Sequence, residues 1–203
     1  MKIGVFGGSF DPIHRGHVEP VAAARRALGL DRVLFVPTAR PPHKPERRLA
    51  PALARYAMAE LALLDFPELE VASLELFAER PTYTIESLER LRGERPGDEI
   101  WLLVGADSFL ALHTWRRFRD LLAGFPVGVL ARPGAGTAAP PATALAPELA
   151  AALGGARVEW VANPPLAISA SEIRDRLARG EEPLAGWLDP RVLKFVHKYR
   201  LYR

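Results

Sequence analysis

Residues 3–17 decide the fold, and they read IGVFGGSFDPIHRGH. The apolar residues 3–6 indicate a buried strand, the pair Gly7 and Gly8 indicates a tight turn, and a helical pattern follows from His17. Glycines let a backbone approach a phosphate closely, and the N-terminus of the following helix offers free N–H groups. The stretch matches neither the dinucleotide-binding fingerprint nor the P-loop. It therefore predicts either an anion-binding turn or a plain strand-to-helix connection.

Outward from this stretch, apolar runs alternate with helical patterns along the chain. Strands are expected at residues 33–36, 100–104 and 127–130, with weaker candidates at 69–74 and 158–161. Helices are expected at residues 17–28, 51–64, 85–91, 108–122 with a break near Thr114, and 169–177, and residues 133–147 are expected to form one surface loop. This alternation predicts an α/β fold with a doubly wound, mostly parallel sheet in a single domain over residues 1–203. In such sheets ligands bind beyond the carboxyl ends of the strands. The segments of interest are those that follow Phe6, Val36, Val104 and Val161.

Composition and charge limit the classes of function. The 203 residues are 49% hydrophobic and 25% charged, and they include no cysteine. The apolar runs are too short for a membrane helix and the N-terminus does not resemble a secretory signal, so we expect a cytoplasmic protein that does not bind membranes. The net charge of +3 permits an anionic ligand without demanding a nucleic acid. The absence of Gln and the single Asn163 indicate a thermostable protein, although GC-rich coding also explains the excess of Arg.

Two histidines follow the glycine turn. His14 and His17 are three residues apart at the expected helix start, so their side chains can converge on one point. A pair of cationic donors at that point would neutralise phosphate charge. The alternatives are a zinc pair, which needs a third protein ligand and has no cysteine to draw on, and two histidines that only cap and pack.

A second helix start near the C-terminus has the features of an anion site. Ser169 and Glu172 have the spacing of a capping box, which is a purely structural feature. Arg174 falls in the first turn, where the helix dipole disfavours a cation. The sequence therefore indicates either a bound anion or a compensating surface carboxylate beside Arg174.

Three middle segments bear on a second substrate. His43 and Lys44 lie in a basic stretch that is either a phosphate contact or a solvated loop. Thr84 is expected to cap a helix whose first N–H groups could hold a carboxylate. Asp107, just after Gly105 and the strand at 100–104, could accept hydrogen bonds from ribose hydroxyls.

Trp115 has two interpretations. A tryptophan in a helical segment more often belongs to the core, and the alternative is a stacking platform for a flat ring. Arg116 follows it directly.

Residues 7–17 resemble the GG[ST]FDPxHxGH signature of the nucleotidyltransferase superfamily, in which the two histidines bind the triphosphate of ATP or CTP. Residues 168–174 are similar to the ISx[ST]xxR motif of the same superfamily. With the PPHK, [ST]YT, GxDS and TW segments added, the chain resembles the bacterial nicotinate-mononucleotide adenylyltransferases over nearly its whole length.

The resemblance implies a Rossmann-like nucleotidyltransferase fold and a reaction in NAD biosynthesis. ATP and nicotinate mononucleotide would give nicotinate adenine dinucleotide and pyrophosphate, with Mg²⁺ held mainly by the substrate phosphates. The implied catalytic residues are His14 and His17. The implied ATP-binding residues are Gly7, Gly8, Ser9, Phe10, Ile168, Ser169, Ser171 and Arg174. The implied nicotinate-mononucleotide-binding residues are His43, Lys44, Thr84, Gly105, Asp107, Trp115 and Arg116.

In that family the tryptophan stacks on the nicotinate ring, and backbone N–H groups near the threonine and after the tryptophan bind its carboxylate. Relatives often carry Tyr after the tryptophan, where this chain has Arg116, and the expected contact there is through the backbone. The partners implied are small-molecule substrates, with neither a nucleic acid nor a membrane, and a homo-oligomer is possible within the family. The alternatives are another adenylyl- or cytidylyltransferase, such as the phosphopantetheine type, and a nucleotide-binding module without catalysis.

Overall fold

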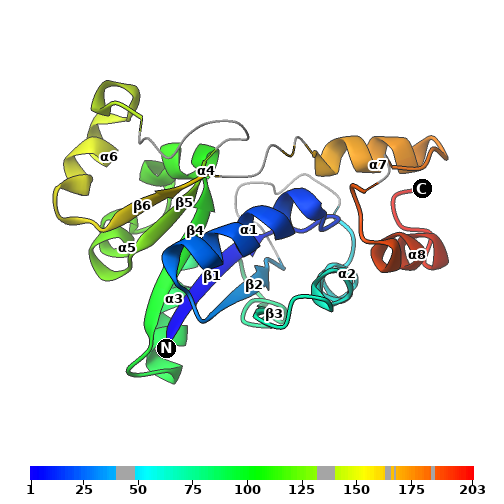
Figure 1. Ribbon diagram of the computed structural model, residues 1–203, viewed down its shortest axis with the longest axis horizontal. Coiled ribbons are helices and arrows are strands. Elements are labelled where there is room, and N and C mark those ends of the chain that lie inside the picture. Colours follow the sequence, from blue (N-terminus) through cyan, green and yellow to red (C-terminus); the bar gives the residue numbers. More distant parts are fainter. Residues whose placement is uncertain (40–48, 132–139, 163–165, 167, 184–185) are drawn as a thin grey trace.

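The structure is a computed structural model, and it describes residues 1–39, 49–131, 140–162, 166, 168–183 and 186–203. Its centre is one sheet of six parallel strands in the order β3-β2-β1-β4-β5-β6 (Figure 1). The strands are β1 (Lys2–Gly8), β2 (Arg32–Pro37), β3 (Leu69–Val71), β4 (Glu99–Gly105), β5 (Val127–Leu130) and β6 (Val158–Val161). This is the strand order of a doubly wound Rossmann-like sheet, so the predicted fold class is confirmed.

The predicted strands are all present, and one is shorter than expected. The run at 69–74 gives a strand only at Leu69–Val71, because β3 is an edge strand that pairs with β2 alone. The central strand β1 pairs on both sides, with Ile3 opposite Arg32 on β2 and Ile100 on β4. The last residues of β1, which include Gly7 and Gly8, therefore lie at the middle of the sheet's carboxyl edge.

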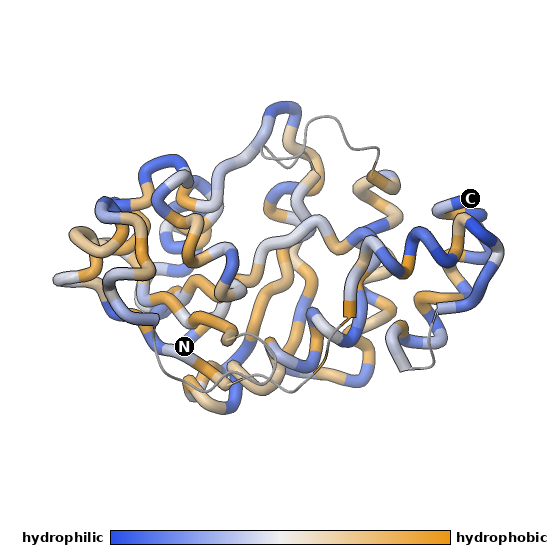
Figure 2. The backbone as a smooth tube through the Cα atoms, turned by 90° about the horizontal axis from the view of Figure 1, so that it is seen from above, coloured by the Kyte–Doolittle hydropathy of each residue, from blue (hydrophilic) through white to orange (hydrophobic). Residues whose placement is uncertain are grey.

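Helices cover both faces of the sheet. The α-helices are α1 (Arg15–Leu28), α2 (Ala52–Leu63), α3 (Thr84–Glu94), α4 (Ala106–Leu110), α5 (Phe118–Gly124), α6 (Pro147–Ala152), α7 (Ala170–Ala178) and α8 (Pro190–Lys198). The short 3-10 helices are η1 (Leu112–Thr114), η2 (Ala142–Ala144) and η3 (Leu153–Gly155). One apolar core joins α1, α2, α7 and α8 to the sheet, and the other joins α3, α4, α5 and α6 to its opposite face. Hydrophobic segments run through the middle of the molecule, and hydrophilic ones lie around its outside, including the region near the C-terminus (Figure 2).

The structure confirms one predicted break between helices and adds a helix at the end of a predicted loop. The break expected near Thr114 is confirmed, since α4 ends at Leu110 and α5 begins at Phe118. The surface loop expected at 133–147 ends in a helix that the sequence reading missed, since α6 starts at Pro147, a residue type that suits a first helical turn. Within that loop the structure describes residues 140–147, which include the turn η2.

Helix α1 approaches the sheet closely because two strand residues have no side chain. A Cβ atom at Gly128 would lie 2.6 Å from Leu103 Cδ2 and 2.7 Å from Leu28 Cδ1. A Cβ atom at Gly4 would lie 2.9 Å from Leu30 Cδ1. All three distances are shorter than real Cβ contacts, so a side chain at either glycine would displace the ends of these leucines where α1 and its following turn pack on the sheet. This close packing fixes the N-terminus of α1 beside the end of β1.

Candidate active site

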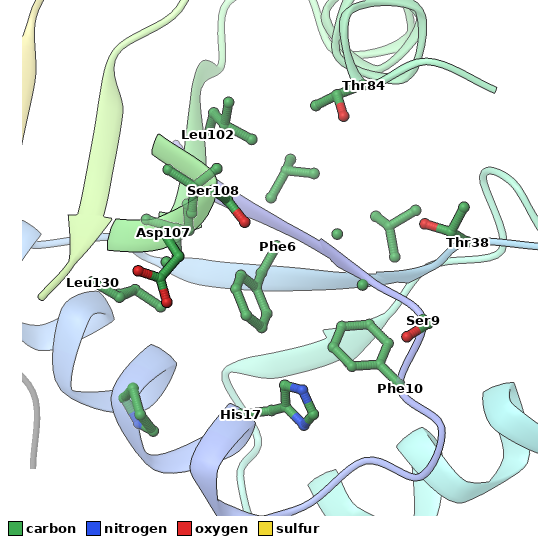
Figure 3. Close-up of a pocket in the computed structure, with 18 of the residues that line it drawn as sticks. Phe6, Ser9, Phe10, His17, Thr38, Thr84, Leu102, Asp107, Ser108 and Leu130 are labelled. Carbon is green, nitrogen blue, oxygen red and sulfur yellow. The ribbon is translucent and has the colours of Figure 1, made fainter. Parts of the chain in front are cut away.

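The site is a cleft of about 610 Å³ at the carboxyl edge of the sheet (Figure 3). Its walls come from the ends of β1, β2, β4 and β5, the N-termini of α1, α3 and α4, and the segment before α7. The segments after Phe6, Val36, Val104 and Val161 all contribute, as the parallel-sheet rule predicted. In Figure 3, His17 and Thr84 lie on opposite sides of the opening, with Phe6 between them.

Most of the predicted site residues line this cleft. They are Gly7, Gly8, Ser9, Phe10, His17, Thr84, Gly105, Asp107, Trp115, Arg116 and Ile168. Four others are not part of its lining, namely His14, Ser169, Ser171 and Arg174. His43 and Lys44 lie outside the described residues.

Gly7 and Gly8 were expected to form a turn, but they are the last two residues of β1, and Gly7 has open space beside it. A Cβ atom at Gly7 would meet nothing within 4 Å, whereas one at Gly8 would lie 2.8 Å from the Phe10 ring. Phe10 has a positive φ of 46° and is buried, and its ring contacts His17 edge to face at 5.4 Å. Gly8 is therefore needed to admit Phe10, and Phe10 in turn supports the imidazole of His17.

The rings of His14 and His17 stack on each other, but their surroundings differ. Their ring centroids are 3.7 Å apart, and the His14 backbone N–H donates to His17 Nδ1 at 3.3 Å. A side chain at Gly16 would lie 3.0 Å from His14 Nδ1, which explains the glycine between them. Only His17 reaches the cleft, while His14 is buried behind it.

The expectation of two cationic histidines is therefore wrong for His14. Burial, and secondly the neighbouring His17, lower the pKa of His14 to about 2, so His14 is neutral at physiological pH. The described residues also contain no group of three His, Asp or Glu side chains that could hold a metal ion, so the structure shows no third ligand for a zinc pair.

The first turn of α7 contacts the β1–α1 loop through Arg174. Its Nη1 donates to the Asp11 carbonyl oxygen and lies 3.9 Å from Asp11 Oδ2, and its Nη2 donates to Ser171 Oγ at 2.9 Å. Asp11 is buried, and its Oδ1 also accepts from the Tyr202 hydroxyl at 2.8 Å and from the Ala50 backbone N–H at 3.1 Å. A carboxylate does compensate Arg174, as one alternative held, but that carboxylate is buried rather than on the surface.

The expected capping box at α7 is wrong. Ser169 is the N-cap residue, yet its side chain makes no capping hydrogen bond, and its backbone carbonyl accepts from Ile173. The first-turn hydroxyl that is used is that of Ser171, which accepts from Arg174 instead.

The other end of the cleft is formed by α3 and the segment between α4 and α5. Thr84 is the first residue of α3 rather than its cap, because Tyr83 occupies the N-cap position and makes no side-chain capping bond. Trp115 follows η1 directly and has an extended backbone. Its side chain is half-buried, and it lines the cleft together with Arg116. The Arg116 guanidinium lies over the Tyr83 ring, 4.7 Å from its centroid.

Known proteins share both the sequence and the fold. The cytidylyltransferase-like family matches residues 5–176. The chain belongs to this family. It is 38% identical to a Thermus thermophilus protein named probable nicotinate-nucleotide adenylyltransferase, over all of both chains. It is 37% identical to a protein of the same name from Symbiobacterium thermophilum, over 99% of this chain and 95% of that one.

Among solved structures, the fold is similar to Plasmodium falciparum nicotinic acid mononucleotide adenylyltransferase. For the structure complexed with NaAD the TM-score is 0.77 at 18% identity, over 99% of this chain and 97% of the other. For the structure complexed with APC the TM-score is 0.78 at 17% identity, over 99% and 96% of the two chains. At this identity the likeness concerns the fold.

Two buried polar residues of this cytidylyltransferase-like chain were missed by the sequence reading. Arg55, on α2, donates to the carbonyl oxygens of Ser9 at 2.6 Å and Thr38 at 2.8 Å, and so ties together the turns after β1 and β2. Burial lowers the pKa of Arg55, and Asp11 partly offsets that effect. The sequence held one sign of this role, because Arg55 falls among the apolar positions of the helical segment at 51–64.

Glu75 is the second missed residue, and it lines the cleft. Its carboxylate is buried, and Oε1 accepts from the Ser87 hydroxyl at 2.7 Å. Burial raises the pKa of Glu75, while hydrogen bonds to Ser87 and Thr38 act in the opposite direction. No motif in the sequence marked this glutamate, since it lies in the irregular connection between β3 and α3.

Proposed function

We propose that this chain transfers the adenylyl group of ATP to nicotinate mononucleotide, giving nicotinate adenine dinucleotide and pyrophosphate. The observation that carries the proposal is that one cleft joins two ends of different chemistry. The two glycines at the end of β1 and His17 suit a triphosphate at one end, and Trp115 with the N-terminus of α3 suits a flat carboxylated ring at the other. The full-length relatives carry the name of this activity.

Catalysis in this proposal is alignment and charge neutralisation. The phosphate of the acceptor is already anionic near neutral pH, so its attack on the α-phosphorus needs no general base. The cleft would hold the two phosphates in line, and His17, the histidine that lines it, would stabilise charge on the transferring group. We propose no covalent intermediate.

His14, Arg174 and the two serines take supporting roles. His14 is buried and stacks on His17, Arg174 is hydrogen-bonded to the β1–α1 loop, and the exposed Ser169 and Ser171 lie outside the cleft lining. We propose that a bound triphosphate first contacts Gly7, Gly8 and Ser9, and that His14, Arg174 and the two serines support these contacts. Gly105 and Asp107 are proposed for the acceptor ribose, and His43 and Lys44 for the acceptor phosphate.

The family points to a divalent cation, and we propose that it is Mg²⁺. Within the part of the chain that the structure describes there is no cluster of three candidate ligands, which suits a cation held mainly by substrate phosphates. When bound, it would shield the negative charge of the triphosphate.

Pyrophosphate release from ATP and Mg²⁺ tests the proposal, with nicotinate mononucleotide, nicotinamide mononucleotide and phosphopantetheine as rival acceptors. We expect strong preference for the nicotinate form. Release with phosphopantetheine alone would mean a different adenylyltransferase, and no release with any acceptor would favour a nucleotide-binding module. Basic residues at positions 191–203 could instead contact a nucleic acid, but one of them, Arg191, is already paired with Asp65 at 2.6 Å and with Asp189 at 2.7 Å.

Location, assembly and heat resistance remain predictions. No helix among the described residues is long and apolar enough to cross a membrane. Cell fractionation, sedimentation and thermal unfolding would check the cytoplasmic location, a homo-oligomer and thermostability respectively.

A further inference from the structure

The acceptor end of the cleft contains a cation, Arg116, that has no anionic partner among the described residues. Within the described part of the chain, no carboxylate pairs with Arg116, whose one recorded contact is the Tyr83 ring. The next residue differs, because Arg117 forms ion pairs with Glu89 at 2.9 Å and with Asp120 at 2.7 Å. Two adjacent arginines thus have different surroundings, and only Arg116 lines the cleft.

The backbone around Arg116 is held in place by its neighbours. Arg117 has a positive φ of 54° as the N-cap residue of α5, and its guanidinium bonds both oxygens of Glu89 on α3, at 3.0 and 2.9 Å. Trp115 packs against the apolar core on this face of the sheet. The chain is therefore fixed on both sides of Arg116, which directs this side chain toward α3.

The contact with Tyr83 places the guanidinium beside the start of α3. Tyr83 is the N-cap residue of that helix, and Thr84, its first residue, also lines the cleft. A guanidinium held on an aromatic face keeps its N–H edge available for a planar anion. A carboxylate on a ring stacked against Trp115 would then meet the positive end of the helix dipole and the Arg116 cation together.

We infer that the Arg116 side chain recognises the carboxylate of the acceptor ring and sets the preference for the acid over the amide. This inference rests on the proposed function and adds a side-chain contact to the backbone one expected from the family. A carboxylate gains a charge-assisted hydrogen bond from the guanidinium, whereas a neutral amide does not. Because Arg116 is exposed, solvent screens part of this gain, and we expect a discrimination of about tenfold from this residue.

The test compares Arg116→Gln with Arg119→Gln. Arg119 is a matched control, since its guanidinium also lies over an aromatic ring, 4.8 Å from the Phe118 centroid, but it does not line the cleft. The measured quantity is the ratio of kcat/KM for nicotinate mononucleotide to kcat/KM for nicotinamide mononucleotide. We expect Arg116→Gln to lower this ratio about tenfold through a higher KM for the acid, with the KM for ATP unchanged. Arg116→Lys should retain part of the preference, and Arg119→Gln should keep all of it.

Three outcomes would overturn the inference, and one of them would also overturn the proposed function. An active wild-type chain whose ratio is unchanged in Arg116→Gln would overturn the inference and leave the proposed function intact. Equal losses for both nucleotides would also overturn it, because Arg116 would then bind a part that the two acceptors share. A wild-type chain inactive with every acceptor would overturn the proposed function, and the inference with it.

Discussion

The two ends of the cleft are built in different ways. At the phosphate end, the β1–α1 loop is held by buried polar contacts to distant parts of the chain, from Arg55 on α2, Arg174 on α7 and Tyr202 near the C-terminus. At the acceptor end, the α4–α5 segment is held by ion pairs near the surface, such as that between Arg117 and Glu89. The contacts at the first end are largely buried and join distant parts of the chain, whereas the ion pair at the second end is exposed.

This difference predicts which properties can be changed separately. A buried charge that loses its partner destabilises the whole domain, whereas an exposed ion pair contributes little. Substitutions at the phosphate end should therefore affect folding and catalysis together. Substitutions at the acceptor end should change the choice of substrate while the fold persists.

The largest effect is expected from Asp11→Asn. Removing the Asp11 charge leaves Arg55 and Arg174 without their buried anion, and the loss should be about 3 kcal/mol of unfolding free energy. Urea unfolding measures it, and the KM for ATP should rise in the same variant. Tyr202→Phe, which removes one hydroxyl bound to Asp11, is the control and should lose about 1 kcal/mol. Equal stability of wild type and Asp11→Asn would show that the network is not a structural link.

A somewhat smaller effect is expected from His17→Ala, and it concerns the catalytic rate rather than stability. Its imidazole lines the cleft, and loss of one transition-state donor should lower kcat at least about 100-fold. Steady-state kinetics with saturating ATP and acceptor measure this. His197→Ala, on the surface of α8 beside Glu182, should turn over normally. Near-normal turnover of His17→Ala would remove His17 from the mechanism.

Trp115→Ala probes the acceptor end. Loss of a stacking face is worth about 1–3 kcal/mol, so the KM for nicotinate mononucleotide should rise about tenfold or more while the KM for ATP stays constant. Trp115→Phe should recover part of the affinity. A large drop in melting temperature without a change in KM would instead assign Trp115 to the core.

The smallest effect is expected from Glu75→Gln, measured as stability against pH. Because burial raises the pKa of Glu75, the folded chain binds this proton more tightly than the unfolded chain. The wild type should therefore lose stability as pH rises from the ordinary glutamate range near 4.3 through the raised pKa. The variant lacks this loss, so it should be more stable at neutral pH by on the order of 1 kcal/mol, with the advantage vanishing in acid. A constant difference across pH would contradict the raised pKa.

Local patterns in the sequence were enough for the fold class and the position of the site. Continuous apolar runs bounded by Gly or Pro are typical of strands buried on both faces, and all six runs proved to be strands. The failures were of two kinds. Thr84 was expected to cap α3, but the N-cap residue is Tyr83, one position earlier; Ser169 occupies the N-cap position of α7, but its side chain makes no capping hydrogen bond.

The second kind of failure concerns residues whose partners are distant in sequence. Asp11 and Arg174 are 163 positions apart, and nothing local indicates that they meet. Burial is likewise a property of the whole fold, and it is burial that makes His14 neutral and raises the pKa of Glu75.

The sequence by itself determined the alternating strands and helices, the paired glycines ahead of a helix N-terminus, and eleven of the residues that line the cleft, because these follow from local patterns and motifs along the chain. Only the tertiary structure decided which histidine faces the cleft, which carboxylate compensates Arg174, and which of two adjacent arginines has no anionic partner among the described residues. The physical reason is that electrostatic and packing energies depend on distances through space, and parallel strands bring together residues from opposite ends of the chain.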